Sequence, residues 1–127
     1  MNSYKSRASG VAILSLMSTS QEFALLFRAT RVLDPDELTR RNAAARDWAL
    51  TLGRDGALVH ASPLEAAGFT VTQNAVVPVH HDRAVASVLV IRAPDLESAL
   101  TLAKGHPGLA FGTEIEVRPL KAVGVSR

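Results

Sequence analysis

The order in which apolar patterns follow one another restricts the fold of this chain more than any other feature. A continuous apolar run, Phe23 to Phe27, is typical of a strand buried on both faces. A strong helix start follows, because Asp34 suits the N-cap, Pro35 suits the first helical position and Glu37 completes a capping-box pattern. Small, apolar or amide side chains then recur every three or four positions, at Leu38, Asn42, Ala45, Trp48 or Ala49, and Leu52.

The remaining segments alternate between strand and helix patterns. Glycines at positions 53 and 56 are expected to end the first helix. We then expect a short strand over 57–61, a hairpin with arms 69–72 and 75–79, a central strand over 84–91, a second helix over 94–104 and a last strand over 113–120.

This order predicts an α+β domain of the ferredoxin-like, split β-α-β-β-α-β kind, with two helices on one face of an antiparallel sheet. The central strand is apolar on both sides, with Val85, Leu89 and Ile91 on one and Ala86, Val88 and Val90 on the other. Since only one side can face the helices, we expect a homodimer that covers the other side and forms a dimeric α/β barrel.

The domain is expected to span residues 21–121, with a flexible leader over 1–20 and a C-terminal tail over 122–127. In the leader, Lys5 and Arg7 precede a short apolar run, 11–17, that resembles a secretory signal. No convincing cleavage site follows, and the run is too short for a membrane span. We therefore favour a cytoplasmic protein with no membrane contact. A signal peptide and a short extra strand or helix that packs on the domain are the alternatives for this segment.

Composition excludes several classes of site. The chain of 127 residues has no cysteine, so disulfides, zinc-thiolate sites and cysteine nucleophiles are excluded. A net charge of +2 comes from 14 basic and 12 acidic residues scattered along the chain, which argues against nucleic acid as a partner. There is no phosphate-binding glycine loop and no nucleophile-elbow motif, so we expect no cofactor.

Four segments resemble the YCII-related, or DGPF-domain, family. Asp95 to Leu100 carries "D-L-x-x-A", Gly105 to Gly112 carries "P-x-x-x-x-G", and Thr113 to Leu120 carries "I-E-V-R-P". Trp48 to Leu64 is similar to the "G-x-L-x-x-G-P-L" passage of that family. The resemblance covers about residues 22–120 and implies a dimeric ferredoxin-like α+β barrel.

The same resemblance also implies chemistry that this chain does not retain. Some members resemble enzymes that eliminate chloride from a chlorinated aromatic, with a histidine and an aspartate around the first helix proposed for proton transfer. An ungapped register puts Ala45 at the histidine position and Arg54, beside Asp55, at the aspartate position. The Asp-Gly-Pro-Phe turn is also absent. The catalytic residues are therefore unknown.

Candidate ligand-binding residues are Arg28, Trp48, His60 and His106, expected around a cleft between the first helix and the sheet. Three of them have a simpler interpretation: Trp48 as core, His60 as a solvent-facing or backbone-bonded residue, and His106 as a cation at the end of the second helix. His80, His81 and Asp82 are better explained as a polar turn than as a metal site, since adjacent strand residues point to opposite faces.

Two function classes remain open. One is a dimeric module that binds a small organic ligand without the histidine–aspartate dyad. The other is a small-molecule lyase or isomerase that uses a histidine as proton carrier.

Overall fold

The structure is a computed structural model that describes residues 20–80 and 84–121. Its elements are β1 (Gln21–Ala29), α2 (Pro35–Arg54), β2 (Leu58–Pro63), β3 (Phe69–Val71), β4 (Val76–Pro78), β5 (Val85–Ala93), α3 (Leu96–Lys104), the 3-10 helix η1 (Pro107–Phe111) and β6 (Thr113–Pro119). The expected leader, the expected tail, His81 and Asp82 lie wholly or almost wholly outside the described residues.

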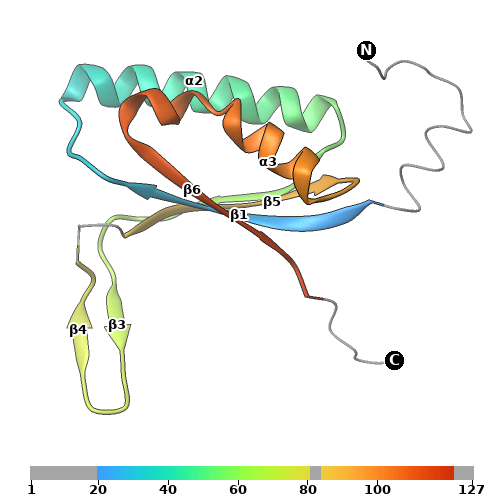
Figure 1. Ribbon diagram of the computed structural model, residues 1–127. Helices are drawn as coiled ribbons and strands as arrows, with labels where there is room; N and C mark the ends of the chain where they lie inside the picture. Colours follow the sequence, from blue (N-terminus) through green and yellow to red (C-terminus); the bar gives the residue numbers. More distant parts are fainter. Residues whose placement is uncertain (1–19, 81–83, 122–127) are drawn as a thin grey trace, which may run out of the picture.

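Four strands form one antiparallel sheet in the order β2-β5-β1-β6, and both α2 and α3 cover the same face of it (Figure 1). The predicted α+β class is therefore confirmed, and the arrangement is compatible with a ferredoxin-like fold. β3 and β4 form a separate two-stranded hairpin that projects from the side of the sheet opposite the helices (Figure 1). We call this hairpin, residues 69–78, the arm.

The start of α2 forms the predicted capping box. The Asp34 carboxylate accepts a hydrogen bond from the Glu37 N–H at 2.8 Å, and the Glu37 carboxylate accepts one from the Asp34 N–H at 3.1 Å. Asp55 ends the helix, and Gly56 follows with a φ of 80°, a left-handed conformation that favours glycine. Local sequence therefore determines both ends of this helix.

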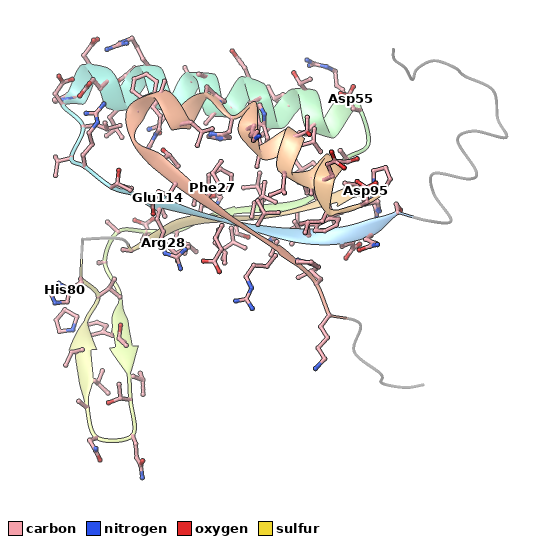
Figure 2. All side chains as sticks on the ribbon, in the orientation of Figure 1. Phe27, Arg28, Asp55, His80, Asp95 and Glu114 are labelled. Carbon is pink, nitrogen blue, oxygen red and sulfur yellow. The ribbon has the colours of Figure 1, made fainter. Side chains whose placement is uncertain are left out.

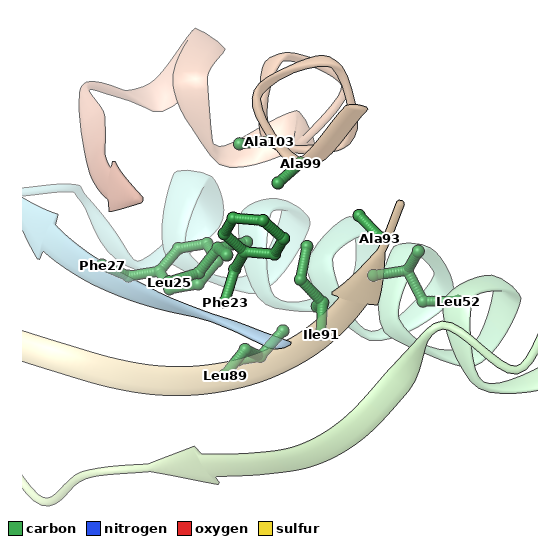
Figure 3. Packing of buried hydrophobic residues seen from close by; sticks show 9 residues of the cluster. All are labelled: Phe23, Leu25, Phe27, Leu52, Leu89, Ile91, Ala93, Ala99 and Ala103. Carbon is green, nitrogen blue, oxygen red and sulfur yellow. The ribbon is translucent and has the colours of Figure 1, made fainter. Parts of the chain in front are cut away.

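The core lies between the sheet and the two helices (Figure 3). Phe23, Leu25 and Ile91 are fully buried, and α2 and α3 close over them with Leu52 and two alanines, Ala99 and Ala103. Small alanines on α3 let this helix approach the sheet closely. This packing of large strand residues under small helix residues stabilises the domain.

The expectation that β1 is buried on both faces is wrong for the single chain. Phe23, Leu25 and Phe27 are buried, whereas Ala24 and Leu26, which point to the other face, remain partly exposed. The strand alternates because the helices cover only one side of the sheet. The predicted stripe on α2 also fails at its beginning, where Leu38 stays 42% exposed. Leu52, near the end, is the one buried residue of this helix.

Candidate functional site

A cavity of about 460 Å³ lies between α2 and the end of the sheet formed by β1 and β5. On α2 it is lined by Ala45 and Ala49, and beneath them by Ala29, Ala86 and Ser87. These side chains are too short to fill the space between helix and sheet. The cavity is therefore a direct result of placing small residues on both facing surfaces.

A bulge at the start of β5 contributes to the same opening. Phe27 lies opposite Ser87, but the next residue, Arg28, lies opposite Val85, so the ladder omits Ala86. One extra residue in a strand bends it and re-aims its side chains. Both Ala86 and Ser87 line the cavity as a result.

The apolar part of the lining is formed by Phe27, Trp48 and Leu89. Phe27 and Leu89 belong to the core, and Trp48 packs against it from α2. The expectation of Trp48 as core is thus confirmed in part, since its indole is half-buried against the core and also borders the cavity. Aromatic and aliphatic walls of this kind suit an apolar ligand body.

His106 is the buried polar residue of the site. It is 8% exposed, and its ring lies 4.8 Å from the Phe27 ring and 4.7 Å from the Trp48 ring, centroid to centroid. Burial, and secondarily the positive charge of Arg41, lower the pKa of His106 from 6.5 to about 4. The imidazole is therefore neutral at pH 7, and the interpretation of His106 as a cation at the end of α3 is wrong.

The tautomer of His106 follows from its backbone contact. Nδ1 accepts a hydrogen bond from the Gly108 N–H at 2.9 Å, so the proton of the neutral ring is on Nε2. In this way His106 caps η1, which follows it, instead of α3, which precedes it. The site therefore contains a neutral ring that presents one N–H donor.

Gly108 makes this close contact possible. A Cβ atom at this position would lie 2.8 Å from Oγ1 of Thr113 and 2.9 Å from Cε1 and Nδ1 of His106. No side chain larger than hydrogen fits without displacing the imidazole. The position of His106 against Trp48 thus depends on a glycine two residues later.

Three arginines border the cavity, but they are not equivalent. Arg28 follows Phe27 on β1, so its side chain belongs to the sheet face opposite the helices (Figure 2). It forms an ion pair with Glu116 at 2.7 Å. Arg41 and Arg46 come from α2. Arg41 hydrogen-bonds only to the amide oxygen of Asn42, at 2.8 and 3.1 Å, and Arg46 has no hydrogen bond or ion pair with any described residue.

The structure brings three of the four predicted site residues to one cavity. Arg28, Trp48 and His106 line it, and so does Ala45, the position at which the family resemblance would place a histidine. His60 does not. It lies on β2 opposite Val90, exposed on the sheet face away from the helices, and its ring bonds to the hydroxyl of Ser62.

Other residues of the site were not predicted. Arg41 and Arg46 lie off the stripe predicted for this helix and Asn42 lies on it, yet all three line the cavity. The signal was Asn42, a polar residue at a position where the stripe should be apolar. For the metal interpretation, the described residues contain no group of three or more potential ligands, and His80 is exposed beyond the end of β4.

Comparisons with known proteins add no identity to this geometry. No family model matches the chain, and no curated protein matches it. Within the part of the chain that the structure describes, no helix is long and apolar enough to cross a membrane.

Proposed function

We propose that this protein binds a small organic ligand in the cavity between α2 and the sheet. The observation that carries the proposal is the cavity itself: about 460 Å³, walled by Phe27, Trp48 and Leu89, and bordered by a few polar groups from α2 and His106. Small-molecule sites generally have this size and this combination of apolar walls and few polar groups.

Binding is a better explanation of the site than proton transfer. A general base works best when its pKa lies near the working pH, and the pKa of His106 is about 4. Its Nδ1 is also occupied by the Gly108 N–H. The lyase or isomerase alternative therefore lacks a suitable proton carrier among the cavity residues, and a binding module of the YCII-related kind is the function we propose.

Trp48 provides the test, because it is the one tryptophan of the chain and it lines the cavity. A panel of small cyclic compounds, some neutral and some anionic, is titrated against its fluorescence. We expect a saturable change for part of the panel. Ala45→Leu places a larger side chain in the cavity and should abolish the change, whereas Ala43→Leu, at an exposed position of the same helix, should preserve it. Absence of any saturable change, or equal loss in both variants, would contradict ligand binding in this cavity.

We also propose that two copies of the chain associate through the sheet face that the helices leave open. On this face Ala24 lies opposite Val90 and Leu26 opposite Val88, so the two central strands form an apolar centre. Charged and polar residues border it: His60 and Ser62 on β2, Glu116 and Arg118 on β6. An apolar centre with a polar rim is the usual composition of a protein interface.

Two observations favour a second copy as the occupant of this face. Its charges are balanced, with ion pairs between Glu22 and Arg92 and between Arg28 and Glu116, so an identical face would meet no net repulsion. The arm projects to the same side (Figure 1). One of its faces exposes Phe69 by 69%, Val71 by 73% and Val76 by 64%. A lone hairpin is only marginally stable, so its apolar face favours contact with a partner.

Sedimentation velocity tests the association. We expect a dimer at tens of micromolar protein and a monomer for Val88→Glu, which puts a charge in the apolar centre. Val32→Glu, at a position 94% exposed and away from this face, is the matched control and should remain a dimer. A monomeric wild-type protein would refute the proposal, and circular dichroism of both variants checks that they are folded.

A further inference from the structure

The charged residues that line the cavity, among those described, are all arginines. None of the described residues that line it is an aspartate or a glutamate, whereas Arg41 and Arg46 line it from α2. The guanidinium of Arg28 is neutralised by Glu116 on the other sheet face. Among the described residues, the charge that a ligand would meet in the cavity therefore comes from Arg41 and Arg46, and it is positive.

These two guanidinium groups are available to a ligand. Arg41 contacts only a neutral amide oxygen, that of Asn42, and Arg46 has no partner among the described residues. Guanidinium groups form strong hydrogen bonds with carboxylates and phosphates, because two N–H donors fit two oxygens of the anion. Neither guanidinium group is therefore paired with a described carboxylate, and both belong to residues that line the cavity.

The geometry of α2 places the two arginines on either side of the cavity roof. With about 100° of rotation per residue, Ala45 and Ala49 form the middle of the inner face, Arg41 falls on the flank of Trp48, and Arg46 falls on the opposite flank. A ligand head group under the alanines would therefore have one arginine on each side. Its body would lie against Phe27 and Trp48.

From this arrangement we propose that the ligand is a small organic acid, with its carboxylate held by Arg41 and Arg46 and its apolar body against Trp48 and Phe27. The neutral His106 presents its Nε2–H as a further donor for a hydroxyl or carbonyl group. Carboxylate is favoured over phosphate because Arg41 and Arg46 lie in the middle of α2, where backbone N–H groups are already bonded within the helix. This inference rests on the proposed function of the cavity.

The experiment compares benzoate with benzamide, which has the same shape and no charge, by titration against Trp48 fluorescence. We expect benzoate to bind about tenfold more tightly. Arg46→Gln and Arg41→Gln should each reduce benzoate affinity severalfold and leave benzamide affinity unchanged. Arg54→Gln removes the same charge from an exposed position at the end of α2, away from the cavity, and should have no effect.

The outcomes separate the two proposals. If neither compound changes Trp48 fluorescence and the wider panel also fails, ligand binding in the cavity is refuted together with this inference. If benzamide binds as well as benzoate, only the organic-acid inference is overturned. Equal loss of benzoate binding in Arg46→Gln and Arg54→Gln would overturn it as well, because the effect would then reflect net charge. Competition by inorganic phosphate at the same concentration as benzoate would overturn the choice of carboxylate.

Discussion

The imidazole of His106 lies edge-on to the indole of Trp48, with ring centroids 4.7 Å apart and planes at 72°. Edge-to-face packing of this kind is favourable between aromatic rings. The contact joins α2 to the segment that follows α3 and forms one wall of the cavity. It also keeps His106 out of water, which is the main cause of its low pKa.

Burial of His106 makes the stability of the protein depend on pH. Below pH 6.5 the unfolded chain takes up a proton on this residue, whereas the folded chain does so only below about pH 4. The free energy of unfolding should therefore fall as the pH is lowered from 6.5 to 4, by on the order of 2 kcal/mol from this residue. Urea unfolding of wild type and His106→Gln across this range measures the difference.

Comparing wild type with His106→Gln separates the contribution of His106 from that of the acidic side chains. The pKa of Glu37 and that of Asp95 are also lowered, chiefly by backbone N–H donors at their helix starts. Protonation of these two carboxylates in acid therefore destabilises the wild type and the variant alike. Subtracting the two pH profiles removes their contribution. An NMR titration of the His106 ring with a midpoint near 6.5 would show that the residue is not buried as described.

Replacing Gly108 by alanine should destabilise the protein by about 1–3 kcal/mol, because the new methyl group would overlap His106 and Thr113. Displacement of the imidazole should also change Trp48 fluorescence. Gly53→Ala is the control, since nothing lies within 4 Å of its added Cβ and it occupies a helical position. There alanine should stabilise by roughly 0.5–1 kcal/mol. Thermal denaturation of both variants measures these changes. If Gly108→Ala left the stability unchanged, the space around Gly108 would not be as tight as described.

His60→Gln should leave both stability and ligand affinity nearly unchanged. His60 is exposed on β2, its ring contacts Ser62, and it is not among the residues that line the cavity. Surface substitutions of this kind change stability by about 0.5 kcal/mol or less. Thermal melting and the Trp48 titration are the measurements, and loss of ligand binding in His60→Gln would place the site on the other face of the sheet.

Asp34→Ala should cost about 1 kcal/mol, since it leaves the Glu37 N–H without its acceptor and removes half of the capping box. Asp47→Ala, at an exposed position within the same helix, should be neutral or slightly stabilising because alanine is the better helix former. The two denaturation midpoints are compared directly. Equal midpoints would indicate that the cap does not limit the stability of α2.

The sequence alone was sufficient for features that depend on neighbouring residues. The capping residues Asp34 and Glu37 and the glycines after position 52 specified the limits of α2. Short apolar runs separated by turn residues indicated the strands and the hairpin. From the order of these elements the α+β class and the antiparallel sheet with two helices followed. Capping, periodicity and turn chemistry depend on residues close together in the sequence, so they can be recognised without a structure.

The site was decided by tertiary packing. Phe27, Trp48 and His106 are far apart in the chain and meet only because the sheet register and the helix positions bring β1, α2 and the end of α3 together. No local pattern distinguished His106, which is buried and neutral, from His60, which is exposed. Nor did any pattern show that the Arg28 guanidinium pairs with Glu116 while Arg41 and Arg46 border the cavity without a carboxylate partner among the described residues. The bulge at Ala86 and the small residues under α2 create the space, and whether two facing surfaces fill the gap between them is a property of the folded chain.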